Sequence, residues 1–271
     1  MNVTRQGYYV WLKRKPTDRE RANSELGDLI ESIFHQYKRR YGVKRIQDEL
    51  KDRGVRTSKR RISRLMRERE LETKGKKKFR VTTDSKHKQP VAPNTLNREF
   101  APVAPNQVWA GDITYIWTQQ GWVYLAVFLD LFSRKVVGWA TSKTLETSFV
   151  LLAFERALAR RTPGNGLLVH TDRGSQYASN AFKQVLTQAH CELSMSRKGN
   201  CWDNAVSESF FARFKVEAIH GETFHTREDL EYEVFDYIER FYNKIRKHST
   251  IEYLSPNQYE YLFNNKEALA A

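Results

Sequence analysis

The 271-residue sequence predicts an α/β domain with a mixed five-stranded sheet, preceded by a smaller all-α domain. Five apolar runs rich in β-branched and aromatic residues lie between 108 and 196, and helical patterns separate the later ones. In residues 19–71, apolar side chains instead recur every three or four positions, as on helices. A basic run and four prolines separate the two regions, which therefore form different domains.

Positive charge is concentrated in the first third of the chain. Residues 1–90 hold 27 Lys and Arg against 12 Asp and Glu, whereas the other 181 residues hold 19 against 20. This distribution is typical of a nucleic-acid-binding domain attached to a near-neutral core. The alternative is a basic surface that serves only solubility.

The N-terminal region divides into a short segment, 1–18, and a domain at 19–72. The short segment is aromatic and basic. It forms either a helix that docks on a neighbour or the tail of a domain supplied by another chain.

Three helices are predicted in the N-terminal domain, and capping residues mark their ends. They are expected at 19–37, 43–53 and 59–71. Gly54 suits the left-handed position after a helix, and Thr57 or Ser58 can cap the next one. A helix, a short turn with glycine and an arginine-rich helix form the pattern of a helix-turn-helix, whose last helix enters the major groove of DNA. A three-helix packing module with a solvated basic face is the alternative.

The DNA-binding residues predicted in and after this domain are basic. They are Arg60, Arg61, Arg64 and Arg67 on the third helix and Lys76 and Lys77 in the segment that follows. That segment, 73–105, contains prolines that interrupt regular structure, so we expect an extended linker that follows a phosphate backbone.

The α/β core is predicted over residues 106–263, with a short C-terminal tail at 264–271. Its strands are expected at 108–118, 122–130, 135–141, 167–172 and 192–196. Its helices are expected at 144–161, 180–189, 204–215 and 227–246. Three hairpin-linked strands followed by alternating helices and strands form an α/β layout of the ribonuclease-H kind.

Three acidic residues of the core lie where a carboxylate is unexpected. Asp112 interrupts the apolar run 108–117, Asp172 ends the run 167–172, and Glu208 lies on a predicted helix. An ionised carboxylate among apolar residues is costly unless it is paired, protonated or bound to a metal. Two acids on strands and one on a helix suggest a two-metal site for phosphoryl transfer.

The spacing and the surroundings of these acids resemble a known family. Asp112 and Asp172 are separated by 59 residues, and Asp172 and Glu208 by 35, which resembles the Asp-Asp-Glu triad of integrases and transposases. The flanking segments look like the second reading frame of insertion-sequence-three transposases. They are Trp109–Tyr115, Leu129–Trp139, His170–Tyr177, Ser196–Phe211, Arg246–Thr250 and Leu254–Pro256. The resemblance covers 106–263, and residues 20–71 resemble the helix-turn-helix of the family.

This resemblance implies a DNA transposase with an integrase core, which cuts the ends of an insertion sequence and joins them to another strand. Water, and then the 3′-hydroxyl, attacks phosphorus in line without a covalent enzyme intermediate. Two Mg²⁺ ions are expected, with Mn²⁺ as a substitute, because small hard cations prefer carboxylate oxygens. We assign Asp112 as the ligand shared by both ions, and Asp172 and Glu208 as ligands of one ion each.

Lys215 is a further candidate for the site. It lies seven positions after Glu208, two helical turns along the same face, and resembles the basic residue of the family at that offset. We expect it to hold a DNA phosphate; the alternative is a solvated surface lysine. Arg173, Asn200 and Asn204 are weaker candidates for DNA contacts.

Other polar residues near these segments are given structural roles. Asp130 ends a strand, and Asp203 can cap the helix that carries the third acid. A zinc site at His190, Cys191 and Cys201 is conceivable, but its spacing matches no standard zinc motif.

The expected partners follow from the resemblance. They are double-stranded DNA, as terminal inverted repeats and target, other copies of the chain on that DNA, and an upstream-frame product as fusion or partner. The two cysteines, the polar N-terminus and the lack of a long apolar run favour the bacterial cytoplasm and nucleoid, without a membrane. Two rival functions are a ribonuclease-H-like nuclease without joining activity and a non-catalytic helix-turn-helix regulator.

Overall fold

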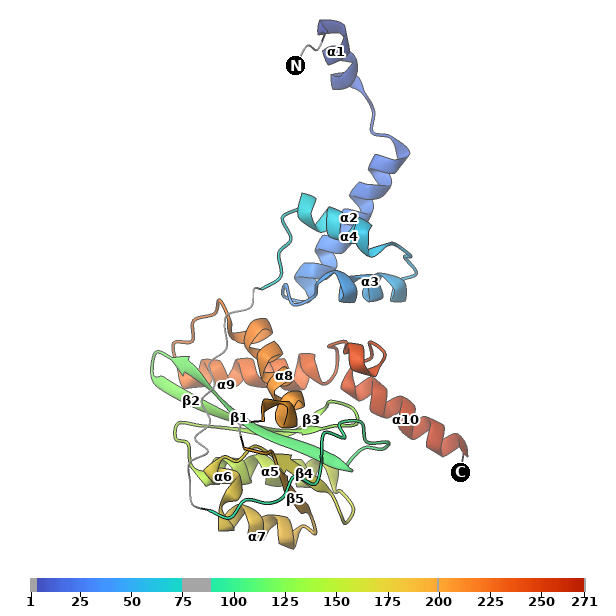
Figure 1. Cartoon of the computed structure of the whole chain (residues 1–271). Coiled ribbons are helices and arrows are strands. Elements are labelled where there is room, and N and C mark those ends of the chain that lie inside the picture. Colours follow the sequence, from blue (N-terminus) through green and yellow to red (C-terminus); the bar gives the residue numbers. More distant parts are fainter. Residues whose placement is uncertain (1–3, 75–88, 199, 271) are drawn as a thin grey trace. The chain divides into compact units, whose positions relative to one another are not determined.

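The computed structural model describes residues 4–74, 89–198 and 200–270, which belong to two compact units (Figure 1). The first unit ends at Lys74 and the second begins at Gly75. The first is helical in its described part, and the second contains a five-stranded sheet.

Three helices form the core of the first unit. They are α2 (Asp18–Gln36), α3 (Val43–Asp52) and α4 (Lys59–Glu68). A capping box between Thr17 and Glu20 starts α2, and Ser58 Oγ accepts the Arg61 N–H at the start of α4. Gly54, with φ of +78°, makes the turn after α3 in a conformation that favours glycine. The buried side chains that these helices share include Ile30, Ile33, Phe34, Ile46, Leu50 and Ile62. The predicted all-α domain is therefore confirmed.

A short helix, α1 (Arg5–Lys13), precedes this bundle. Thr4 Oγ1 accepts the Gly7 N–H and caps its first turn. Within the described chain α1 buries none of its residues, and Trp11 is 67% exposed. Residues 5–13 of the N-terminal segment are thus helical.

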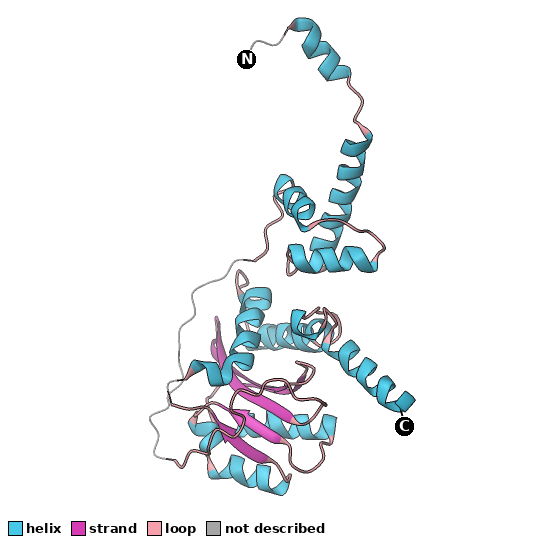
Figure 2. Cartoon of the chain, turned by 45° about the vertical axis from the view of Figure 1, so that its right-hand side comes forward, coloured by secondary structure: helices cyan, strands magenta, loops and turns pink. Residues whose placement is uncertain are grey.

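The second unit is built on a mixed sheet with the strand order β3-β2-β1-β4-β5 (Figure 1, Figure 2). The strands are β1 (Val108–Thr118), β2 (Gly121–Asp130), β3 (Val136–Ser142), β4 (Leu168–Thr171) and β5 (Glu192–Met195). The first three are antiparallel neighbours, whereas β4 runs parallel to both β1 and β5. This is the mixed five-stranded layout that the sequence predicts, so the predicted fold class is confirmed.

Helices cover both faces of the sheet. On one face lie α5 (Thr147–Arg161) and α7 (Asn180–Gln188), and on the other α8 (Ala205–Phe214) and α9 (Arg227–Phe235) (Figure 1). On the α5 face, Phe128, Phe154 and Phe182 are fully buried, and their ring centroids lie 5.2–6.3 Å apart. A Cβ at Gly138 would lie 2.2 Å from the Ala153 carbonyl oxygen, so only glycine permits this approach of α5 to β3.

The segment that precedes the sheet packs on the second unit. Leu96 is buried, and the N–H groups of Thr95 and Leu96 donate to Ser194 Oγ on β5. Part of the predicted linker therefore belongs to the core, because its backbone donors find an acceptor on the edge strand. Lys76 and Lys77 of the linker lie outside the described residues.

The C-terminal helices differ from the single long helix predicted at 227–246. The chain leaves α9 as a π-helical segment, Asp236–Tyr242, and then turns before α10 (Pro256–Ala270). The predicted tail from residue 264 is a continuation of α10. Among the helices that the structure describes, none has both the length and the apolar character to cross a membrane.

Arg161 at the end of α5 fastens α10 to the sheet. Its guanidinium donates to Asp130 at the end of β2 and to both carboxylate oxygens of Glu260 on α10, at 2.8–3.1 Å. Its Nε also donates to Asn106. Because Asp130 is fully buried and held in this way, its role here is structural, as predicted.

Candidate active site

Asp112 and Asp172 lie beside each other where two parallel strands stop pairing. The last paired residues of β1 and β4 are Gly111 and Thr171, and the two acids are the next residues of the chain. Neighbouring strands lie about 4.8 Å apart, so this register brings together acids that are distant in sequence. Asp172 Oδ1 accepts the Gly174 N–H at 2.8 Å, in a turn that ends the strand.

Burial and repulsion dominate the electrostatics of Asp112. Its pKa lies well above the usual range of aspartate, first because the carboxyl is buried and then because Asp172 and Glu208 carry negative charge. Hydrogen bonds from the Ile113 N–H and the Asn204 amide oppose this shift. Burial also raises the pKa of Glu208. The structure therefore brings the three predicted acids within electrostatic reach, with Asp112 as their common neighbour.

The three acids do not form a closed cage in the described part of the chain. Within the part of the chain that the structure describes, no three His, Cys, Asp or Glu side chains gather closely enough to hold one ion. The conceivable zinc site is also disfavoured, because burial raises the pKa of Cys191 to about 11 and zinc binds the thiolate.

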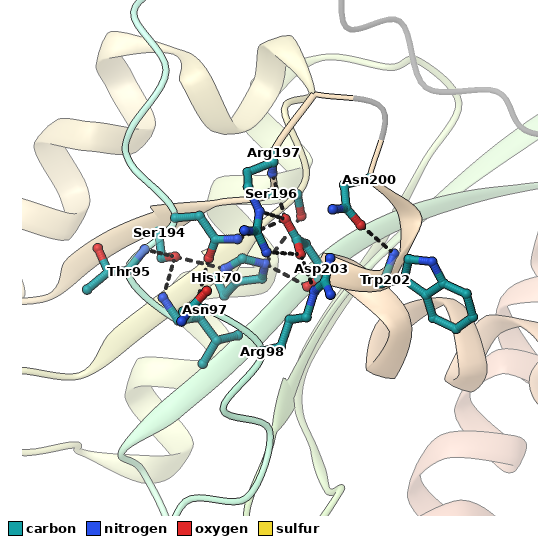
Figure 3. Close-up of polar contacts among 12 residues, drawn as sticks. Thr95, Asn97, Arg98, His170, Ser194, Ser196, Arg197, Asn200, Trp202 and Asp203 are labelled. Carbon is teal, nitrogen blue, oxygen red and sulfur yellow. Dashed lines mark hydrogen bonds and ion pairs between the residues drawn. The ribbon is translucent and has the colours of Figure 1, made fainter.

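Asp203 fixes the loop that leads into α8 (Figure 3). Its buried carboxylate accepts three hydrogen bonds from the N–H, Nε and Nη2 of Arg197, at 2.8–3.0 Å. Arg98 Nε and Asn94 Nδ2 add two more from the segment before the sheet, at 2.8 Å each. Arg197, more than any other partner, holds the pKa of Asp203 well below its usual range. The prediction that Asp203 caps α8 is wrong, because Asn204 occupies that position.

His170 connects β4 to the same loop (Figure 3). Its Nε2 lies 2.9 Å from the Asp203 carbonyl oxygen, and its Nδ1 lies 2.9 Å from Ser194 Oγ. A carbonyl only accepts, so Nε2 carries the proton and Ser194 donates to Nδ1. Burial lowers the pKa of His170, which agrees with a neutral ring. Since Ser194 also accepts the N–H groups of Thr95 and Leu96, one network holds β4, β5 and the loop before α8.

Lys215 approaches the acids from the end of α8. Burial lowers its pKa, and the charge of Asp112 acts in the opposite direction. Its Nζ lies 5.4 Å from the centroid of the Tyr115 ring on β1. Lys215 begins the π-helical segment Lys215–Ile219, which continues the helix of Glu208. The structure therefore brings Lys215 into the same site as Asp112.

Tyr177 has no predicted role, yet it lies within electrostatic reach of Asp112 and Asp172. It belongs to the short helix α6 (Ser175–Ala178), and its side chain is fully buried. Among the described residues its hydroxyl has no hydrogen-bond partner, a situation that costs about 1–3 kcal/mol. Burial, and then the charges of Asp112 and Asp172, raise the pKa of Tyr177 well above its usual value. The only sequence signal for this residue was its place at the end of the segment that contains Asp172.

The arginines of α4 separate into two groups. Arg60, Arg64 and Arg67 are exposed. Arg61 instead donates from Nε to Asn23 Oδ1 on α2 at 2.9 Å, and its Nη2 donates to a carbonyl of the same helix. The structure therefore leaves three of the four predicted arginines on the surface and uses the fourth in helix packing.

The weaker candidates for DNA contacts are already engaged by the protein. Arg173 Nε donates to the Ser196 carbonyl at 2.7 Å, and the Asn204 amide donates to the acid on β1. Asn200 Oδ1 accepts the Trp202 N–H at 3.2 Å. The indole of Trp202 points away from the network and is 69% exposed (Figure 3).

Both units match models of known domain families. A model described as an integrase core domain matches residues 102–201, a second with the same description matches 208–262, and an HTH-like domain matches 20–79. The HTLV-2 integrase catalytic core domain in complex with magnesium is a solved structure with 17% identity and a TM-score of 0.43. The match covers 58% of this chain and 98% of the HTLV-2 integrase domain.

Two relatives match over nearly the whole chain. Transposase InsF for insertion sequence IS3A of Escherichia coli (strain K12) is 40% identical over 262 residues, which are 96% of this chain and 91% of the relative. The transposase for insertion sequence element IS904 of Lactococcus lactis subsp. lactis (strain IL1403) is 41% identical over 249 residues, 92% and 98% of the two chains. The helix-turn-helix unit binds DNA, and the integrase core makes the chain a polynucleotidyl transferase. The chain thus belongs to the insertion-sequence-three family of transposases.

Proposed function

We propose that this transposase cuts the ends of its insertion sequence and joins them to a target strand with Asp112, Asp172 and Glu208 as catalytic acids. The observation that carries the proposal is the register that sets Asp112 beside Asp172, on the strand contacted by the helix of Glu208. Burial and repulsion make Asp112 costly to ionise in the protein alone. Such a cluster becomes favourable when positive charge enters it.

The residues fit divalent cations. Their donors are carboxylate oxygens, which Mg²⁺ and Mn²⁺ prefer, and Mg²⁺ needs only one or two of them because it retains water and phosphate ligands. Asp112 would be a ligand of both ions, Asp172 a ligand of one and Glu208 a ligand of the other. When bound, such ions activate an attacking oxygen and offset the charge that develops at phosphorus. The charges of both other acids act on Asp112, which supports its place as the shared ligand.

Groups of the protein orient the reacting atoms. The Asn204 amide holds Asp112, and Asp203 fixes the loop before the helix of Glu208. Lys215 is a half-buried cation beside Asp112, which suits it to hold the phosphate that is cut or joined. Water, and then the freed 3′-hydroxyl, attacks phosphorus directly in line. No side chain bonds covalently to DNA in this mechanism.

The first unit is proposed to hold the terminal inverted repeats. In a helix-turn-helix, the last helix lies in the major groove, and here that helix is α4. Its exposed arginines, Arg60, Arg64 and Arg67, are the proposed contacts to phosphates and base edges. Lys76 and Lys77 remain proposed phosphate contacts of the linker.

Partners beyond DNA belong to the same proposal. Two element ends are joined to one target, and one copy of the chain at each end would supply an active site to each, so we propose a homo-oligomer on DNA. An upstream-frame product, as fusion or partner, remains a prediction of the family resemblance.

One assay tests the function directly. The purified chain is incubated with labelled element ends, target DNA and Mg²⁺, and the cut and joined products are separated. We expect both products with the wild type, and neither with Asp112→Asn, Asp172→Asn or Glu208→Gln, which keep shape but remove ligand charge. Glu155→Gln, an exposed acid on α5, is the matched control and should behave as wild type.

The rival functions give different outcomes in this assay. Cutting without joining, even when the upstream product is added, identifies a nuclease. Binding of ends with no metal-dependent product identifies a regulator. Wild-type joining by any of the three acid variants would end the assignment of that acid.

A further inference from the structure

The buried hydroxyl of Tyr177 is not explained by packing. The ring lies among phenylalanines, with its centroid 5.5 Å from that of Phe182 and 6.4 Å from that of Phe128. Phenylalanine would fill the same space without burying a polar atom. Within the described structure the hydroxyl has no hydrogen-bond partner, and such orphaned groups in native proteins usually mark a functional role or a missing water or ion.

Tyr177 lies close to Asp172 across Gly174. A Cβ built on Gly174 would lie 3.0 Å from Asp172 Oδ1 and 3.6 Å from Tyr177 Cδ2. One small volume at Gly174 therefore touches both the carboxylate and the edge of the ring. A side chain at Gly174 would contact both groups, so glycine leaves the space between the ring edge and the carboxylate open.

Tyr177 also packs near the strand that carries Asp112, with Phe128 between them. Phe128, whose ring is perpendicular to that of Tyr177, is the cross-strand partner of Gly111. A Cβ at Gly111 would lie 2.6 Å from the Phe128 ring, so Phe128 packs directly against the backbone next to Asp112. Phe128 thus links Tyr177 to the backbone that carries Asp112, and the charges of Asp112 and Asp172 both act on the Tyr177 hydroxyl.

We propose that Tyr177 is a positioning residue, whose hydroxyl donates a hydrogen bond to an oxygen of the Asp112–Asp172 pair when that pair binds divalent cations. The proposal rests on the function proposed above, because it needs a cation to draw the acids together. Without a bound cation, we expect the hydroxyl to have no hydrogen-bond partner, which lowers the stability of the protein. In the loaded protein it holds a carboxylate in the orientation that the cation requires, as outer-shell groups do at other metal sites.

The test compares full-length wild type with Tyr177→Phe by thermal unfolding without cation and in a titration with Mg²⁺ or Mn²⁺. Without cation, the melting temperature of Tyr177→Phe should equal or exceed that of wild type, because an unpaired hydroxyl is removed. The cation concentration for half-maximal stabilisation should rise by three- to tenfold, tenfold being the change that 1.4 kcal/mol produces. The Mg²⁺ concentration for half-maximal joining should rise by a similar factor.

Tyr237→Phe is the matched control. Tyr237 is also fully buried, but its hydroxyl donates to Glu217 Oε2 at 2.9 Å. Its loss should lower the melting temperature without cation and leave the cation midpoint unchanged. The two variants therefore separate an orphaned donor from a satisfied one.

Each outcome decides one question. If Tyr177→Phe is stabilised by cation at the wild-type midpoint, or melts well below wild type without cation, the positioning role is refuted. If wild type itself, like Asp112→Asn, gains no stability from cation, the metal site of the proposed function fails and takes this inference with it. If the cation stabilises wild type but not Asp112→Asn, the proposed function stands, whatever the cation midpoint of Tyr177→Phe.

Discussion

Glu217 and Arg246 form a buried, two-fold ion pair, with Nε to Oε2 and Nη2 to Oε1 both at 2.7 Å. Glu217 lies on the π-helical continuation of α8, and Arg246 follows the π-helical segment after α9. The Tyr237 hydroxyl also donates to this carboxylate. The pair ties the helix of Glu208 to the C-terminal part of the chain, and both charges are almost fully removed from water.

Breaking this pair should destabilise the second unit strongly. Glu217→Gln leaves the Arg246 guanidinium buried without a counter-charge, so we expect a loss of about 3–5 kcal/mol in the free energy of unfolding. The double variant Glu217→Leu/Arg246→Met, which removes both charges, should recover at least half of the loss. Urea unfolding of the three proteins measures this. A double variant that is no more stable than Glu217→Gln would mean that the two charges do not compensate each other.

Lys215 should act on joining rather than on metal binding. Lys215→Ala should lower the rate of strand joining by more than tenfold, with little change in the Mg²⁺ concentration for half-maximal activity, because the lost group holds phosphate and no metal. Lys215→Arg should recover part of the rate, since it restores the charge. Lys244→Ala, an exposed lysine of the same unit, is the control. A defect of Lys215→Ala that excess Mg²⁺ corrects would contradict the assignment.

The exposed arginines of α4 should set the salt dependence of end binding. Replacing Arg60, Arg64 and Arg67 by Ala should weaken binding by over tenfold and flatten the plot of log affinity against log salt by about 0.9 for each lost phosphate contact. Arg61→Ala should instead lower stability by about 1 kcal/mol, because its hydrogen bonds to α2 are lost, and leave that slope unchanged. Filter binding at several salt concentrations distinguishes the two effects. Equal slopes in all three proteins would refute the predicted interface.

Asp203 should make the second unit sensitive to acid. Its pKa is lower in the folded protein than in the unfolded chain, so its stabilisation is complete above about pH 4, the usual aspartate pKa, and is lost as pH falls below that value. Asp203→Asn should therefore cost about 2–4 kcal/mol near pH 6, and the difference from wild type should shrink below pH 4. Unfolding by urea between pH 2.5 and 6 gives both curves. A difference independent of pH would show that shape, not charge, matters at this position.

Sequence patterns were sufficient for the main elements. The apolar runs at the future β1 and β2, the capping residue Ser58 and Gly54 are local signals, and each element they mark is present. The fold class and the family were likewise predictable. The roles of the triad remain a prediction, since what the structure adds is the register that sets Asp112 beside Asp172.

What could not be predicted depends on contacts between distant segments. Arg61 has the same sequence signal as Arg60, and only the position of Asn23 on α2 turns it inward. Asp203 is five residues from Glu208, which suggested a helix cap. Its carboxylate instead accepts hydrogen bonds from Arg98, which precedes the first strand in sequence, and from Arg197, which follows the last. Tyr177 resembles a core aromatic residue in every local respect. Its proposed role depends on the unpartnered hydroxyl and on the nearby acids, which only the structure reveals.

The dependence of the core on its C-terminal residues has a consequence for synthesis. The first unit is complete once Lys74 has been made, whereas the second needs Arg246 to neutralise Glu217 and Glu260 to engage Arg161. At about 5–20 residues per second, the 197 residues after Lys74 take roughly 10–40 s to translate. Even after Glu208 has been added, the contacts of Arg246 and Glu260 that complete the second unit have still to be made. We therefore expect the first unit to fold, and to become able to meet DNA, before the second unit is complete.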